Sequence, residues 1–261
     1  MTQGLTNAGN TTESSTSSSA NTDVATGHDL LGRVFDAVLF DMDGTLVDSE
    51  KLWDISLQEL YRRLGGELSP AIRDATVGGS SDGVMRIVYA DLGLHPDPDE
   101  MAATAAWLHD YTGELFDGGL PWCEGARELL DTLADEAVPM ALVTNTRRAL
   151  TERALNSIGR HYFSASVCGD EVAHAKPAPD AYERAAALLG LDPGQCLAIE
   201  DSVTGAAAAE DAGCPVLVVP NDVEVPSSPR RRHVLSLTQV GIPQLREIHA
   251  ELLLGLGERT A

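Results

Sequence analysis

Two carboxylates, Asp41 and Asp43, stand one residue apart directly after the apolar run 34–40. Such a run is typical of a central strand in a parallel sheet, and these sheets bind ligands at the carboxyl ends of their strands. Gly44 then allows a tight turn. Two ionised carboxylates at the edge of a core repel each other, so we expect a hard cation such as Mg²⁺ between them. Taken alone, the pattern also suits a strand-to-helix turn that Asp43 merely caps.

Groups that suit an anionic substrate occur at two later positions. Thr144 and Asn145 follow the apolar run 138–143. A hydroxyl, an amide and the backbone N–H groups of a turn can all donate to phosphate oxygens. Lys176 is a cation within the stretch 175–180, where two prolines restrict the backbone and would hold the amine in place.

A second carboxylate pair, Glu200 and Asp201, follows the apolar run 196–199. Ser202 comes next and precedes an alanine-rich helical segment that Gly205 opens. For Ser202, a helix N-cap and a role in steadying the acidic turn both stay open. Two acidic pairs, a hydroxyl and a lysine at separate strand ends are more than helix caps alone require.

The composition limits the classes of partner. The 261 residues include 40 acidic and 18 basic side chains, a net charge of -22, which argues against nucleic acid or an anionic membrane as a partner. The four cysteines are widely scattered, which is typical of a reducing compartment. No apolar stretch approaches the roughly 20 residues that span a bilayer, and no secretory signal begins the chain. We therefore expect a cytoplasmic protein, and a monomer.

Apolar runs alternate with helical segments from residue 34 onward, which predicts a doubly wound parallel α/β sheet. Strands are expected at 34–40, 138–143, 165–168, 196–199 and 215–219. Helices are expected at 147–158, 203–212 and 243–254. The stretch 226–232, with its arginine triplet, is expected to be a solvated loop.

The segment between the first two strands is far longer than one crossover helix requires. Apolar residues recur there at helical spacing in 52–64, 82–92 and 100–116, with almost no strand signal. We therefore expect a small helical cap at 50–120, inserted into a core domain made of 31–49 and 121–261. Residues 1–30 are polar and low in complexity, and we expect a disordered tail there.

Four motifs, Asp41-Met42-Asp43-Gly44-Thr45, Thr144-Asn145, Lys176-Pro177 and Glu200-Asp201, occur in this order within residues 34–220. In this ordered set the chain closely resembles the haloacid dehalogenase superfamily of phosphohydrolases. The site of the insertion resembles the subgroup with a small helical cap, which includes β-phosphoglucomutase and phosphoglycolate phosphatase. The resemblance implies a Rossmann-like core, an active site between core and cap, and a small phosphorylated metabolite as the substrate.

The resemblance also implies roles for the motif residues. Asp41 would attack phosphorus and form an aspartyl-phosphate, and Asp43 would act as general acid and then general base. Thr144 and Asn145 would bind the phosphoryl group in transfer, and Lys176 would offset its charge and orient Asp41.

A magnesium site is implied by the same resemblance. Asp41, the backbone carbonyl of Asp43 and Asp201 would hold Mg²⁺, and Glu200 would bind it directly or through water.

The cap loop that contains Gly79, Ser80 and Ser81 is expected to contact the substrate. In β-phosphoglucomutase the corresponding loop usually carries an arginine that grips a second phosphate, and Ser81 occupies that position here. A serine cannot supply this charged, bidentate contact, so hydrolysis of a phosphate monoester is the first choice. A sugar phosphomutase remains the alternative, with Arg86 or a lysine elsewhere in place of the missing arginine.

Two further activities are disfavoured. Haloacid dehalogenation needs no metal, and Asp43 and the Glu200-Asp201 pair argue against it. A silent binding protein is disfavoured because competent residues occupy every catalytic position. The sequence does not distinguish a sugar phosphate from a nucleotide or a two-carbon acid.

Overall fold

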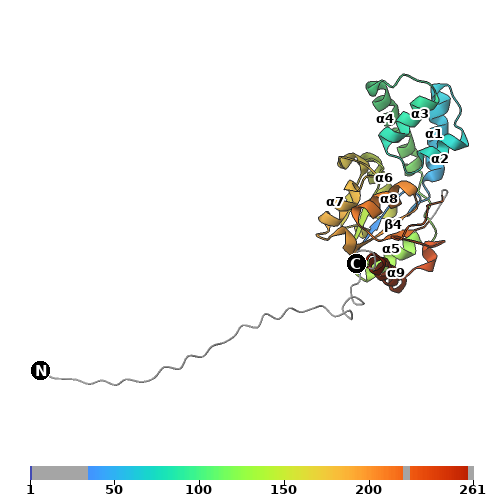
Figure 1. Cartoon of the computed structure of the whole chain (residues 1–261). Helices are drawn as coiled ribbons and strands as arrows, with labels where there is room; N and C mark the ends of the chain where they lie inside the picture. The colour runs from blue at the N-terminus through green and yellow to red at the C-terminus, as the bar shows by residue number, and fades with distance from the viewer. Residues whose placement is uncertain (2–34, 220–223, 258–261) are drawn as a thin grey trace. The chain divides into compact units, whose positions relative to one another are not determined.

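A parallel sheet of six strands, in the order β3-β2-β1-β4-β5-β6, forms the centre of the structure (Figure 1). This computed structural model describes Met1 and residues 35–219 and 224–257, so the tail expected at 1–30 lies outside the described residues except for Met1. The strands are β1 (Ala37–Phe40), β2 (Met140–Val143), β3 (Ala165–Val167), β4 (Cys196–Glu200), β5 (Val216–Val218) and β6 (Arg231–His233). The prediction of a parallel α/β sheet is confirmed.

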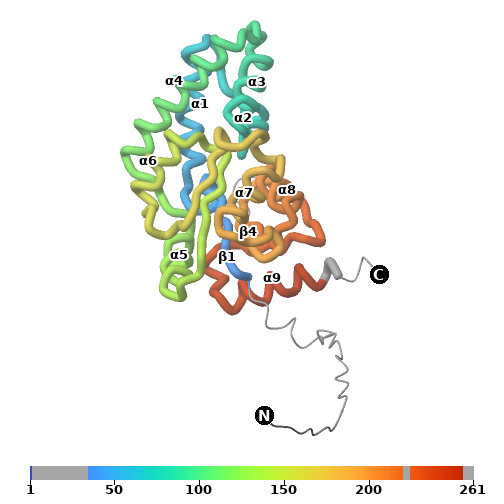
Figure 2. The backbone as a smooth tube through the Cα atoms, turned by 90° about the vertical axis from the view of Figure 1, so that its left-hand side faces the viewer, coloured from blue at the N-terminus to red at the C-terminus, as the bar shows by residue number. Residues whose placement is uncertain are grey.

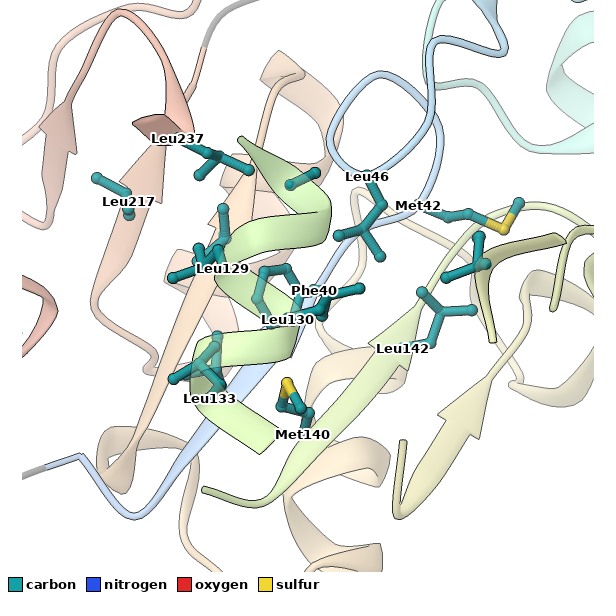
Figure 3. Close-up of a cluster of buried hydrophobic side chains, with 14 of the residues drawn as sticks. Phe40, Met42, Leu46, Leu129, Leu130, Leu133, Met140, Leu142, Leu217 and Leu237 are labelled. Atoms are coloured by element: carbon teal, nitrogen blue, oxygen red, sulfur yellow. The ribbon is translucent and has the colours of Figure 1, made fainter. Parts of the chain in front are cut away.

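Helices cover both faces of the sheet, which is why β1 is apolar and buried along its whole length. Val38 and Phe40 pack in one apolar cluster with α5 (Ala126–Asp135), α6 (Arg148–Ile158) and α9 (Ile242–Gly257). Figure 3 shows Phe40 in this cluster beside Leu130 of α5.

The other face of the sheet carries smaller side chains. Ala37 and Leu39 pack there against α7 (Asp180–Leu188) and α8 (Val203–Ala212), whose buried residues are mostly alanines. Small side chains allow these helices to lie close to the sheet.

The expected loop at 226–232 is partly wrong, because Arg231 and Arg232 belong to β6. β6 is an edge strand in which Arg232 is exposed, and it pairs with β5 through backbone hydrogen bonds. An edge strand of this kind needs no apolar alternation, so the sequence carried no strand signal there.

The first four of the five helices between β1 and β2 form the cap, α1 (Glu50–Leu64), α2 (Pro70–Thr76), α3 (Ser81–Asp91) and α4 (Pro98–Asp117) (Figure 2). They enclose their own apolar cluster, which includes Leu60, Tyr61 and Val88. The three helices expected in this segment are confirmed, and α2 was not predicted. Among the described residues, no helix has the length and apolar character to cross a membrane.

Candidate active site

The ends of β1, β2 and β4 bring the predicted motifs together. β1 lies between β2 and β4, and Phe40 is level with Leu142 and Ile199. The residues that follow these strands therefore lie side by side at the carboxyl end of the sheet. The backbone N–H of Asp41 continues this pairing and donates to the oxygen of Ile199.

Lys176 lies at the centre of the site and is almost fully buried. Its Nζ lies 2.6 Å from Asp41 Oδ1 and 2.6 Å from Glu200 Oε1, and it donates to the oxygen of Val143 at 2.8 Å. Burial alone would lower the pKa of Lys176, but the two carboxylates raise it above its ordinary value. The amine therefore stays charged and uses all three protons within the protein.

Three buried carboxylates, those of Asp41, Glu200 and Asp201, have oxygens within 4.8 Å of one another. Burial, and then the charge of Glu200, raise the pKa of Asp41. Burial, and then the charge of Asp41, raise the pKa of Asp201. No residue in the described part of the chain donates a hydrogen bond to the Asp201 carboxylate or forms an ion pair with it.

A buried carboxylate without a partner is costly, and one lysine cannot neutralise three carboxylates. Oxygen ligands in a tight group are the donors that hard divalent cations prefer. The residues present therefore fit a metal ion beside Asp201.

Asp43 lies apart from this acidic group and is held by four donors. Ser49 Oγ donates at 2.6 Å from the residue that precedes α1, and Trp53 Nε1 donates at 3.3 Å from the first turn of α1. Thr146 Oγ1 donates at 2.7 Å and Thr144 Oγ1 at 3.2 Å, both from the loop after β2. Sequence reasoning missed Ser49, Trp53 and Thr146, although a second threonine two residues after the first was a signal for Thr146.

The side chain of Asn145 is used within the protein. Its Nδ2 donates to the backbone oxygens of Gly78 and Lys176, and its Oδ1 accepts from the backbone N–H of Lys176. The contact predicted between Asn145 and a phosphoryl group would therefore come from its backbone N–H.

Glu200 is fixed from several sides. Tyr182 donates from its hydroxyl to Glu200 Oε1 at 2.6 Å, and sequence reasoning missed this residue. Ser202 donates to Glu200 Oε2 at 3.2 Å and also accepts from the backbone N–H of Gly205. Both roles considered for Ser202 are therefore present. A Cβ on Gly205 would lie 1.9 Å from Glu200 Oε1, so only glycine fits there.

The cavity beside these groups is lined by residues of both the core and the cap. Two of the three predicted loop residues, Gly79 and Ser81, line it, whereas Ser80 serves as the N-cap of α3. Ser81 Oγ lies 2.9 Å from Nε2 of His109 on α4, which sequence reasoning also missed. Burial, and then the charge of Arg147, lower the pKa of His109 to about 4, so it is neutral at neutral pH.

The cations that line the cavity, Arg73 and Lys176, are both ion-paired. Arg73 lies on α2 and binds Glu50 and Asp54. Arg86 is exposed on α3 and does not line the cavity, so the structure does not place it as a substitute for the missing loop arginine.

Comparison with known proteins places the chain among related sequences. Residues 35–213 match the family model of the haloacid dehalogenase-like hydrolases. The chain is 32% identical over 226 residues to hexitol phosphatase B of Escherichia coli, covering 84% of this chain and 96% of that protein. It is 32% identical over 184 residues to a fructose-1-phosphate phosphatase of Escherichia coli, covering 67% and 92%.

The fold is shared with solved structures. A β-phosphoglucomutase from Clostridium difficile aligns with a TM-score of 0.74 at 19% identity, covering 85% of this chain and all of that one. At this identity the likeness concerns the fold alone. The shared fold includes the helical cap. The family match and the relatives above show that the chain belongs to the haloacid dehalogenase-like hydrolases and is a phosphatase, a phosphoric monoester hydrolase, of that family.

Proposed function

We propose that this phosphatase hydrolyses a small sugar or sugar-alcohol monophosphate through an aspartyl-phosphate on Asp41. The observation that carries the proposal is the buried group of Asp41, Lys176, Glu200 and Asp201. Among the described cap residues that line the cavity beside this group, the one cation, Arg73, is ion-paired. We also propose that the cap comprises residues 50–120 and the core 31–49 and 121–261, because α1–α4 enclose their own apolar cluster.

In the first step Asp41 attacks phosphorus, the bond from phosphorus to the ester oxygen breaks, and Asp43 gives a proton to the leaving alcohol. In the second step Asp43 takes a proton from water as that water attacks the aspartyl-phosphate, which releases inorganic phosphate and restores Asp41. Lys176 orients Asp41 by holding its Oδ1 and offsets negative charge beside the phosphoryl group. The backbone N–H of Asn145 would donate to a phosphoryl oxygen, because those of Thr144 and Thr146 already donate within the protein.

We propose Mg²⁺ as the metal. Asp41 and Asp201, with the carbonyl oxygen of Asp43, would hold it, and Glu200 would contact it directly or through water. The ion would neutralise charge on the carboxylates and on the phosphoryl group, which allows an anionic ester to approach an anionic nucleophile.

The polarity of the cap wall supports a neutral, hydroxyl-bearing substrate tail. Ser81 can exchange hydrogen bonds with a hydroxyl group, and the neutral His109 beside it adds no charge to the cavity lining. Arg73 is already bound to two carboxylates. Two relatives whose names specify a hexitol and fructose 1-phosphate support the same class of substrate.

A panel of phosphomonoesters tests this proposal. With Mg²⁺, we expect kcat/KM to be highest for hexose and hexitol monophosphates and low for phosphoglycolate, nucleoside monophosphates and glucose 1,6-bisphosphate. Glucose 1-phosphate should release inorganic phosphate with little 6-phosphate isomer, even when the bisphosphate is added as a primer. Dominant isomerisation would show a mutase instead, and a preference for phosphoglycolate would refute the proposed class.

A further inference from the structure

The loop between α2 and α3, residues 77–80, contacts the core at Gly78. Its backbone oxygen accepts a hydrogen bond from Asn145 Nδ2 at 2.9 Å. Gly78 has a φ of 65°, and a Cβ there would lie 3.2 Å from both Cβ and Oγ of Ser202. The cap loop therefore rests on the turn that contains Asp201, at a point where a side chain would crowd Ser202 and would strain the backbone.

The other side of the Asn145 amide holds the backbone of Lys176. Its second Nδ2 proton goes to the Lys176 oxygen at 3.1 Å, and its Oδ1 accepts from the Lys176 N–H at 2.9 Å. All three partners are backbone groups of fixed donor or acceptor type, so only one orientation of the amide satisfies them. A single side chain thus binds the cap loop and both polar backbone groups of Lys176.

Beyond its backbone, Lys176 reaches the chemical centre. Its Nζ binds Asp41, Glu200 and the oxygen of Val143, and no proton is left over. Because the ammonium group is fully committed, a shift of the Lys176 backbone must be taken up either by the lysine side chain or by these three bonds. Asn145 therefore connects the cap loop, through Lys176, to the side chain of Asp41.

We propose that Asn145 is a positioning residue that links the docking of the cap loop to the placement of Lys176. With the loop seated on Ser202, Asn145 holds Lys176 where it orients Asp41. When the loop leaves, Asn145 loses one of its three hydrogen bonds, and its hold on Lys176 loosens. This inference rests on the proposed function, because its kinetic test uses the proposed hydrolysis.

A double-mutant cycle tests the link. Asn145→Ala removes all three hydrogen bonds, and we expect kcat to fall about 100-fold, with a smaller change in KM, because misplacement of a catalytic group acts in the transition state. Gly78→Ala pushes the loop from Ser202 and should lower kcat about tenfold. If the two residues act through one contact, the double variant is no slower than the slower single variant. Losses that multiply would overturn the proposal.

Hydrogen exchange gives a second test that needs no substrate. Asn145→Ala should speed amide exchange at residues 77–80 and around Lys176, whereas Asn156→Ala, at an exposed asparagine on α6, should not. Unchanged exchange at 77–80, or faster exchange throughout the chain, would contradict the link. A wild-type protein that hydrolyses no phosphomonoester would refute the proposed function, and the exchange result would still decide the link by itself.

Asn145→Asp guards against a variant that fails to fold. It has nearly the same shape and keeps the acceptor for the Lys176 N–H, but it turns a second oxygen toward the oxygens of Gly78 and Lys176. We expect faster exchange at 77–80 with an unchanged circular dichroism spectrum. Wild-type exchange in this variant would also refute the proposal.

Discussion

Tyr182→Phe removes a single buried hydroxyl, and its effect can be estimated from the structure. Tyr182 is fully buried, and its hydroxyl donates to Glu200 Oε1 at 2.6 Å. A hydrogen bond to a charged group contributes about 1.5–3 kcal/mol. For a domain of this size each kcal/mol shifts the melting temperature by about 2–4 °C, so we expect a loss of roughly 3–12 °C. The remaining ring still fills its place, so no cavity adds to the loss.

Tyr162→Phe is the matched control. Tyr162 also donates to a carboxylate, that of Asp131, but on the surface, so its loss should change stability by less than about 0.5 kcal/mol. Differential scanning calorimetry of both variants, with and without Mg²⁺, measures the difference. Equal melting temperatures for Tyr182→Phe and the wild type would refute the reasoning that Glu200 is a buried carboxylate that needs this donor.

Three further changes have expected outcomes. Gly205→Ala should lower both stability and turnover, because its Cβ would displace the buried Glu200 carboxylate; Gly194→Ala, where a Cβ meets nothing closer than 3.9 Å, is the control, and equal thermal denaturation of the two would contradict the account. Asp201→Asn should weaken Mg²⁺ binding more than about tenfold in calorimetric titration. The pKa of Asp201 is raised, so the folded state binds the proton of this carboxyl more readily than the unfolded state does. The contribution of Asp201 to the free energy of unfolding of the wild type therefore becomes more favourable as the pH falls. Without metal, the Asp201→Asn variant should therefore be more stable than the wild type at about pH 8, with an advantage that shrinks toward about pH 5; a constant difference would contradict this sign. Ser81→Arg should tighten inhibition by glucose 1,6-bisphosphate and slow hydrolysis of the monophosphate, and unchanged inhibition would show that this loop does not face the substrate's tail.

Much of the architecture could be predicted because it depends on local patterns. The buried run 37–40 and the following Asp41 show both a central strand and its functional end. The rule that parallel strands bind ligands at their carboxyl ends then placed the remaining motifs beside Asp41. Lys176 and Asp41 are 135 positions apart and lie in contact.

The parts that were missed depend on contacts between distant segments. Tyr182 is one apolar residue in an ordinary helix, and its bond to Glu200 has no local signal. Trp53 and Asp43 approach each other only because the cap is docked on the core. The stretch 175–180 was expected to hold Lys176 by its prolines, whereas Asn145 binds its backbone.

Short elements were also hard to predict, for different reasons. α2 has seven residues, too few to establish a helical period, although Ser69 as N-cap and Pro70 at the first position were usable signals. β6 is polar and lies at the edge of the sheet, where pairing with β5 replaces burial. Neither element affects the motifs, so the position of the site could still be predicted.

Rapid-quench mass spectrometry of the enzyme during turnover of a hexose monophosphate tests the central claim most directly. We expect the peptide that contains Asp41 to gain the mass of one phosphoryl group within a single turnover, as phosphate release begins. Asp41→Asn should fold normally, show no such gain and release no phosphate, because an amide is a poor nucleophile of nearly the same shape. Turnover by Asp41→Asn, or a phosphoryl group on any other residue, would contradict the assignment of Asp41 as the nucleophile.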